Sequence, residues 1–300
     1  MNILFNNVDF NSRSGPNGFG AKLARQLIKE GHEIVSETPH VAISFIQGYV
    51  PQVANILRLD GIYFNSEQNW KEMNGPIKQS YDLADAVICQ SRFNKKLVFK
   101  YFGERDNVFV IHNGTNLDVI ERIDAANTGY KKDKTWLCAS SWRPHKRLFE
   151  NIRFFQKHAK EDEVLFVAGS GDLSPVESAN NEGDLRIKYV GDLSWPQLIS
   201  LMKSSNTFMH LSYLDHCPNV VVDAQAAGCR IICSSSGGTR EIAGRTATTI
   251  EEEIWNFEPL ALYNPPPMDF SKKTNLGLDS DLDISETTLK YTKVMLHVQQ

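Results

Sequence analysis

Strand-like and helix-like segments alternate along the whole sequence. Many of the short runs are continuously apolar rather than alternating with polar residues, as in AVIC (86–89) and VLFVA (164–168). The strands of a parallel sheet have this composition, because helices cover both of its faces. The alternation therefore predicts an α/β fold built from doubly wound, Rossmann-like parallel sheets.

The predicted strands form two sets of six, separated by the polar segment 124–134, which has no apolar face. A chain of 300 residues is long enough for two domains. We expect one domain over residues 1–127 and a second over residues 128–270. The predicted strands are 2–8, 32–37, 41–47, 56–61, 86–91, 108–114, 135–141, 163–169, 187–193, 207–212, 230–236 and 246–250. The predicted helices are 18–31, 92–103, 145–160, 195–205, 219–228 and 284–300.

The C-terminal region interrupts this alternation. Segment 262–283 contains three consecutive prolines and scattered acids, which predicts irregular structure. The terminal helix 284–300 is amphipathic, and Ser285 is a candidate for its cap. We expect this helix to pack back on the first domain.

Composition limits the classes of function and the compartment. The formal net charge is −4, so no basic field indicates a nucleic-acid partner. No apolar run approaches the ~20 residues needed to span a bilayer, and the N-terminus lacks the cationic start of a signal peptide. The five cysteines are an odd count without a CxxC pair, which favours reduced thiols in a cytoplasmic protein.

Two aspartates, Asp215 and Asp223, flank a predicted helix start. Pro218 suits a first turn because its φ is fixed and it lacks an N–H. The N–H groups of Asn219 and Val220 at this start form a ready site for a phosphate. A diphosphate held there would have one carboxylate near each end, and each carboxylate can accept hydrogen bonds from a sugar. The pattern predicts a nucleotide-sugar site; the alternative is two ordinary acids on a helix surface.

Two more loops follow predicted strands in the same half. The first supplies Arg143, Lys146 and Arg147, and the second contains Gly237 and Gly238. Ligands collect at the carboxyl ends of parallel strands, so both loops should converge on the same phosphates. A basic cluster is unfavourable at the start of a helix. That conflict favours phosphate binding over the alternative of a solvated basic surface.

The second half resembles the donor domain of retaining GT-B glycosyltransferases of the GT4 family (glycosyl transferases group 1). Asp215 and Asp223 match the spacing of its acid-x7-acid motif, GGTREI (237–242) resembles its Gly-Gly turn, and CASSWRPHKR (138–147) resembles its phosphate loop. The family usually has glutamate at both motif positions and an arginine where this chain has Ser141. We expect Arg143 to take the place of that arginine. GHEIV, ADAVICQSRF and VIHNGTNLDVI also match family signatures, so the resemblance covers roughly residues 1–245.

The resemblance implies a GT-B fold, with two Rossmann-like domains facing a central cleft. It implies retaining transfer of a sugar from a UDP- or GDP-sugar to an acceptor hydroxyl on a glycan or glycolipid, without a metal or other cofactor. Asp215 would hold the donor sugar, Asp223 the ribose, and Lys146 with Arg143 the departing diphosphate. The implied donor-binding residues are Asp223, Asn219, Val220, Gly237, Gly238, Gly18, Phe19 and Gly191.

In the first half, Asp60 ends a predicted strand, where it could orient or deprotonate the acceptor hydroxyl. The alternative is a turn aspartate before Gly61. The glycine loop after the first strand also fits a dinucleotide site, with Glu37 as the ribose acid. The order of its glycines, G-x-x-G-x-G, is not the usual fingerprint. An epimerase, an NAD-dependent enzyme and a non-catalytic nucleotide- or carbohydrate-binding protein therefore stay open as alternatives.

Two surface features of the first half suggest acceptor contacts. Loop 65–75 carries Glu67, Asn69 and Trp70, a polar-aromatic set of the kind that contacts sugars. Helix 92–103 sets basic against apolar residues, so a peripheral contact with an anionic membrane that holds a lipid-linked acceptor is one interpretation. An ordinary solvated basic face is the other. The basic residues are Arg92, Lys95, Lys96 and Lys100, set against Phe93, Leu97 and Tyr101.

Overall fold

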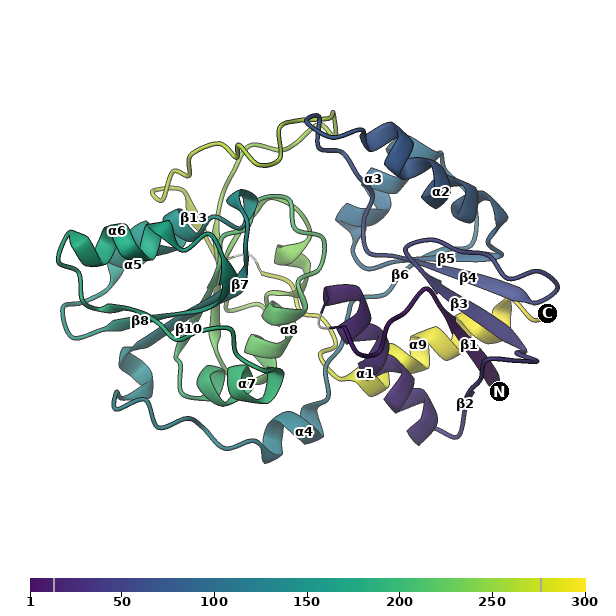
Figure 1. Ribbon diagram of the computed structural model, residues 1–300, viewed down its shortest axis with the longest axis horizontal. Helices are drawn as coiled ribbons and strands as arrows, with labels where there is room; N and C mark the ends of the chain where they lie inside the picture. The colour runs from purple at the N-terminus through teal and green to yellow at the C-terminus, as the bar shows by residue number, and fades with distance from the viewer. Residues whose placement is uncertain (13, 276) are drawn as a thin grey trace. The chain divides into compact units, whose positions relative to one another are not determined.

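The computed structural model describes residues 1–12, 14–275 and 277–300, and these divide into two compact units (Figure 1). Unit 1 comprises Met1–Asn116, Asn256–Leu260 and Asp281–Gln300, and unit 2 comprises Leu117–Trp255 and Ala261–Ser280. Each unit contains one sheet, of six strands in unit 1 and seven in unit 2. The predicted α/β class with two Rossmann-like sheets is confirmed. The division falls after residue 116, so residues 117–127 lie in unit 2 rather than in the first domain.

Unit 1 is built on a parallel sheet with strand order β2-β1-β3-β4-β5-β6. Its strands are β1 (Asn2–Asn6), β2 (Glu33–Ile34), β3 (Val41–Phe45), β4 (Ala54–Leu59), β5 (Ala86–Cys89) and β6 (Val108–Val110). Its helices are α1 (Gly15–Lys29), α2 (Trp70–Leu83), α3 (Arg92–Phe102) and α9 (Ile284–His297). In Figure 1, α1 and α9 lie on one face of this sheet, and α2 and α3 lie on the other.

Alternate residues of these strands build the core beneath α1 and α9. Ile3, Ile43 and Ile56 point to this face and are fully buried. Tyr291 and Met295 of α9 enter the same cluster, so the C-terminal helix completes the core of unit 1. Strands buried on both faces explain why the sequence of β3 is apolar without alternation.

Unit 2 has strand order β13-β12-β11-β10-β7-β8-β9, parallel except for the pairing of β12 with β13. Its strands are β7 (Thr135–Trp142), β8 (Val164–Gly171), β9 (Ile187–Tyr189), β10 (Thr207–His210), β11 (Arg230–Ser234), β12 (Thr248–Ile250) and β13 (Lys273–Thr274). Its α-helices are α4 (Leu117–Arg122), α5 (Leu148–His158), α6 (Ser174–Asn181), α7 (Trp195–Lys203) and α8 (Asn219–Ala226). Figure 1 shows α5 and α6 on one face of the sheet, with α7 and α8 on the other.

Several elements differ from the predictions. Strand β13 lies in segment 262–283, which was expected to be irregular, because Thr274 and Lys273 pair with β12. Residue 276 of that segment lies outside the described residues. Helix α9 is capped by Asp283, whose side chain accepts a hydrogen bond from the Ser285 N–H at 3.0 Å, so Ser285 is not the cap.

Two whole-chain properties bear on the predicted compartment. Among the described residues, no helix has the length and hydropathy required to cross a bilayer. All five cysteines are buried and none forms a disulfide.

Candidate functional site

The switch point of the unit 2 sheet lies between β7 and β10. The chain runs from β7 outward through β8 and β9, then returns to place β10 on the other side of β7. In open parallel sheets, the crevice at the carboxyl ends of such a strand pair is where ligands bind. Lys146 follows β7 and Asp215 follows β10, so the fold brings these two predicted residues to that crevice.

The carboxylate of Asp215 is the centre of the polar contacts there. Lys146 Nζ lies 2.5 Å from its Oδ2, and His210 Nε2 donates to the same oxygen at 2.9 Å. The His216 N–H donates to Oδ1 at 2.9 Å. Burial alone would raise the pKa of Asp215, but the positive charge of Lys146 and the contact with His210 outweigh it and hold this pKa well below its usual range. Asp215 is therefore an anion at neutral pH.

Three histidines surround this ion pair, and burial keeps all of them neutral. Burial lowers the pKa of His216 to about 4. Burial and then the charge of Lys146 lower the pKa of His145 to about 3. Burial also lowers the pKa of His210, against the opposing effect of Asp215. Because the Asp215 carboxylate can only accept, Nε2 of His210 carries the proton.

His210, His216 and Cys217 lie close together in the sequence, but not at the spacing of a zinc site. Within the described ranges, no group of three or more His, Cys, Asp and Glu side chains is arranged to hold a metal ion. Instead, His210 ends β10 and orients Asp215 five residues later. The sequence feature that could have indicated this role is the position of His210 at the carboxyl end of a predicted strand.

The Gly-Gly turn after β11 packs on the backbone of Asp215. Gly238 N–H donates to the Asp215 carbonyl at 2.7 Å, and Asp215 and Gly237 form an isolated parallel bridge. Gly237 has φ +80°, and a Cβ there would overlap the Asp215 carbonyl oxygen. The turn was predicted to approach phosphates; what requires glycine at residue 237 is this close contact with Asp215.

The second aspartate of the predicted pair lies inside α8. Pro218 is the N-cap rather than a residue of the first turn, and Asn219 and Val220 are the first two helical residues. Asp223 is 4% exposed, and its Oδ2 accepts a hydrogen bond from Trp195 Nε1 at 2.9 Å. Trp195 begins α7, so the indole closes one side of the carboxylate predicted to hold the ribose.

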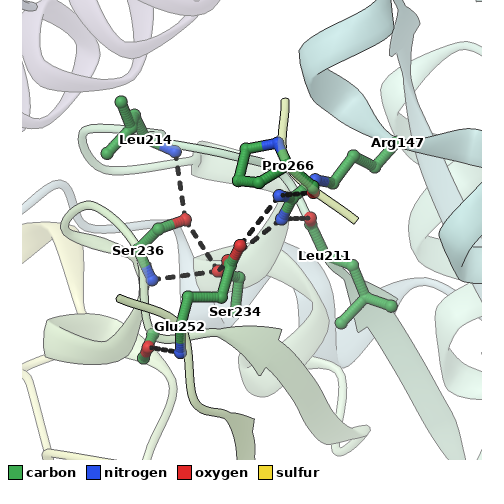
Figure 2. Close-up of polar contacts among 8 residues, drawn as sticks. Arg147, Leu211, Leu214, Ser234, Ser236, Glu252 and Pro266 are labelled. Carbon is green, nitrogen blue, oxygen red and sulfur yellow. Dashed lines mark hydrogen bonds and ion pairs between the residues drawn. The ribbon is translucent and has the colours of Figure 1, made fainter. Parts of the chain in front are cut away.

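The three basic residues of the loop after β7 take different environments. Arg143 is exposed, and Lys146 is bound to Asp215. Arg147 is 1% exposed and forms a bidentate ion pair with Glu252. The loop predicted to converge on the phosphates therefore does not bring all three cations there, because the Arg147 guanidinium lies in the interior of unit 2 (Figure 2).

Gly191 lies after β9, at the same edge of the sheet. It has φ +89° and its carbonyl accepts from the Gly169 N–H at 2.9 Å. A Cβ at residue 191 would meet no atom within 4 Å. The left-handed φ, rather than a close neighbour, accounts for the glycine.

In unit 1, Asp60 follows β4 and joins a buried polar cluster. Arg58, fully buried over the ring of Phe19 at 4.3 Å, forms an ion pair with Asp60 and donates to Asn113 Oδ1 at 2.8 Å. Gln90 donates to the Asp60 carbonyl at 2.6 Å. Burial raises the pKa of Asp60, and Arg58 offsets part of that rise.

Gly18 and Phe19 were predicted to face the donor. Gly18 is the fourth residue of α1, and its N–H donates to the Ser14 carbonyl at 2.8 Å. The side chain of Phe19 is 0% exposed and packs in the core against Tyr291. The prediction for the Phe19 side chain is wrong, because α1 buries this position against the sheet.

The structure also differs from both acceptor surfaces predicted in unit 1. Trp70 begins α2 rather than lying in a loop, and its ring packs edge-on against Tyr101 at 5.3 Å. On α3, Lys100 pairs with Glu258 at 2.6 Å, and Lys95 donates to the Val108 carbonyl at 2.9 Å. These two lysines are engaged within unit 1.

Most of unit 2 matches the model of a known protein family. Residues 119–253 match the family described as Glycosyl transferases group 1, and the match includes Lys146, Asp215 and Asp223. It covers less than half of the chain and lies within unit 2. Unit 2 therefore contains a glycosyl transferases group 1 domain. No curated protein matches the chain by sequence.

Solved structures resemble the chain over nearly its full length. Anabaena Alr3699/HepE in complex with UDP and glucose has a TM-score of 0.71 at 13% identity, covering 99% of this chain and 100% of that chain. AviGT4, a glycosyltransferase involved in avilamycin A biosynthesis, gives 0.68 at 14% identity, with 100% and 98% covered. Sucrose-phosphate synthase from Thermosynechococcus elongatus gives 0.67 at 14% identity, with 99% and 97% covered. These likenesses show the fold alone, which is that of GT-B glycosyltransferases.

Proposed function

We propose that the protein is a retaining glycosyltransferase that moves a sugar from a nucleotide-diphosphate sugar to an acceptor hydroxyl. One observation carries the proposal: the ion pair of Lys146 and Asp215 lies at the switch point of a glycosyl transferases group 1 domain. A cation and a sugar-binding anion are the two charges that a diphosphate-linked sugar needs at its reacting bond. The GT4 assignment and the retaining mechanism belong to this proposal.

On the donor side, Lys146 and Arg143 are proposed to bind the diphosphate. Negative charge builds on this leaving group as the glycosidic bond breaks, so fixed cations stabilise the transition state more than the bound donor. The N–H groups at the start of α8 add to that stabilisation. The proposal includes activity without a metal, because these groups neutralise the phosphates.

Asp215 and Asp223 are proposed to bind the sugars of the donor. Asp215 is an anion with two oxygens already oriented by Lys146, His210 and His216, so it presents its remaining lone pairs in a fixed direction. Asp223 would accept from the ribose beside the Trp195 indole. Each carboxylate then recognises a hydroxyl pair at a different end of the diphosphate.

Asp60 is the proposed acceptor-side carboxylate. A raised pKa suits a group that takes a proton from a hydroxyl at neutral pH, and Arg58 holds the carboxylate in place. The acceptor is proposed to be a glycan or glycolipid hydroxyl. Buried free thiols fit the proposed cytoplasmic location, and a peripheral membrane contact would serve a lipid-linked acceptor.

The search for the donor nucleotide should begin with UDP-sugars. Anabaena Alr3699/HepE was solved with UDP-glucose at a TM-score of 0.69 and 13% identity, covering 99% of this chain and 100% of that chain. We propose a UDP-sugar as the leading donor and a GDP-sugar as the second. Both carry the diphosphate that Lys146, Arg143 and the start of α8 are proposed to bind.

The test is a donor screen with purified protein. Incubation with UDP- and GDP-sugars, with and without EDTA, should release nucleoside diphosphate, and release should be lost in Asp215→Ala. Asp162→Ala, which removes an exposed aspartate of the same unit, should leave release unchanged. Tight NAD binding without nucleoside diphosphate binding would instead support an epimerase or dehydrogenase. Nucleotide binding without turnover would support a non-catalytic binding protein.

A further inference from the structure

Two residues with side chains adopt left-handed backbone conformations beside the proposed site. Arg147 has φ 55° and directly follows Lys146, and Leu214 has φ 53° and directly precedes Asp215. Residues other than glycine rarely adopt such φ values, and surrounding contacts must hold the backbone of these two residues there. Each of the two charged residues of the ion pair is therefore attached to a backbone position that needs outside support.

Arg147 is held through its guanidinium. Nη1 and Nη2 donate to the two carboxylate oxygens of Glu252 at 3.0 Å and 2.8 Å, and Nη2 also donates to the Pro266 carbonyl at 2.7 Å. The Arg147 side chain is 0% exposed and the Glu252 side chain is 7% exposed. The guanidinium also lies over the ring of Tyr213 at 4.8 Å. A buried bidentate pair of this kind fixes both direction and distance.

Leu214 is held by the continuation of the same network (Figure 2). Glu252 accepts a hydrogen bond from Ser234 Oγ, which lies 2.7 Å from Ser236 Oγ. Ser236 Oγ accepts from the Leu214 N–H at 3.2 Å. The network thus runs without interruption from the residue after Lys146 to the residue before Asp215.

We propose that Arg147, Glu252 and Ser236 are positioning residues that set the separation of Lys146 and Asp215. Their polar side-chain atoms bond within the network and to the Leu214 N–H, so they act through the two left-handed residues rather than by contacting a bound donor. That this positioning serves catalysis rests on the proposed function. The rival explanation is that the network only stabilises the fold of unit 2, as a buried polar cluster does in many cores.

Ser236→Ala is the most informative variant. It removes the acceptor for Leu214 without leaving a charge buried and unpaired, whereas Glu252→Gln leaves Arg147 with a weaker partner and lowers stability more. Ser205→Ala is the matched control, since Ser205 is fully buried in unit 2 and its Oγ donates to Leu201 at 2.8 Å. Asp184→Asn is the control for Glu252→Gln, because it weakens the Arg186–Asp184 ion pair near β9.

The first readout follows the titration of the Asp215 carboxyl by ¹³C NMR, with the resonance assigned from Asp215→Asn. Loosening of the Lys146 contact should raise this pKa in Ser236→Ala and Glu252→Gln, and leave it unchanged in both controls. This measurement needs no nucleotide, so it tests the inference even if the protein binds none. An unchanged titration in Ser236→Ala overturns the inference.

The second readout is the affinity for UDP, measured under conditions where each variant is folded. It should fall about tenfold in Ser236→Ala and Glu252→Gln and stay constant in Ser205→Ala and Asp184→Asn. Equal losses in variants and controls at matched melting temperatures would support a purely structural role. Absence of UDP and GDP binding in the native protein would instead contradict the proposed function, while the NMR result would still decide the positioning role.

Discussion

At the residue scale, the ion pair of Lys146 and Asp215 makes the sharpest prediction. Lys146→Ala should weaken UDP binding by about 1.5–3 kcal/mol, the usual contribution of a hydrogen bond to a charged group. This corresponds to roughly a 10- to 150-fold higher Kd. Titration calorimetry measures it directly. The pKa of Asp215 should rise in the same variant, because the lysine charge is a main cause of its depression.

Lys188→Ala is the matched control for this measurement. Lys188 lies on β9 with its Nζ 5.8 Å from the ring centre of Tyr130, so its removal changes the net charge of unit 2 by the same amount. An equal loss of affinity in both variants would indicate a long-range field rather than a phosphate contact. An unchanged affinity in Lys146→Ala would remove this lysine from the site.

His145 makes a prediction about stability and pH. Its folded-state pKa is lowered to about 3, mainly by burial, whereas in the unfolded chain it is about 6.5. Below pH ~6.5 the unfolded chain binds the extra proton, so stability falls as the pH decreases, by about 1.4 kcal/mol per pH unit. His145→Phe keeps the ring beside Tyr263, at 5.4 Å in the native protein, and removes the titration.

Urea unfolding at a series of pH values between about 5 and 7.5 measures this effect. The variant should lose stability less steeply than the native protein as the pH falls. Part of the slope remains, because burial also lowers the pKa of His210 and His216. Identical slopes in both proteins would show that His145 titrates in the folded state as it does in the unfolded chain.

Which site residues the sequence could predict depends on how each is held. Lys146 and Asp215 each follow a strand with a clear pattern, and their meeting is a consequence of parallel-sheet topology. The partner of Arg147, Glu252, lies 105 residues away, and no local pattern connects them. Phe19 was assigned to the donor from the family resemblance, but its position on α1 decides its burial, and this face of the helix packs on the sheet.

At the element scale, the turn after β11 can be tested through Gly237. Gly237→Ala adds the cost of a left-handed residue and an overlap with the backbone of Asp215. Gly183→Ala adds only the first cost, because its φ is +92° and a Cβ there meets no atom within 4 Å. We expect Gly237→Ala to lower the melting temperature more than Gly183→Ala and, unlike it, to abolish UDP binding. Equal effects would show that the turn has room to move away from Asp215.

The elements themselves were predictable where their pattern was local. Each of the strands β1 to β12 corresponds to a predicted apolar run. Helix α2 was missed because Pro76 lies inside it and polar residues surround its start, features that argue against a helix. Strand β13 was missed because its two residues are paired only by their neighbour β12, so tertiary contact rather than propensity forms it.

At the scale of the whole molecule, the chain does not divide at one point. Unit 1 takes the first 116 residues, returns briefly at Asn256–Leu260, and regains α9 from the C-terminal segment after the chain has completed unit 2. Each unit has its own buried cluster, with Met295 in unit 1 and Ile152 in unit 2. Separate cores predict separate unfolding transitions, because each buries its apolar surface within one unit.

Met295→Ala tests this organisation by scanning calorimetry. Met295 is 0% exposed in the unit 1 core, so truncation should cost about 2–5 kcal/mol and lower only the unit 1 transition. Ile152→Ala is the counterpart in unit 2 and should lower only the other transition. If the donor site lies in unit 2 as proposed, UDP at 100 times its Kd should stabilise that second transition by about 2.7 kcal/mol. A single transition shifted by both variants would instead mean that the two cores unfold as one cooperative body.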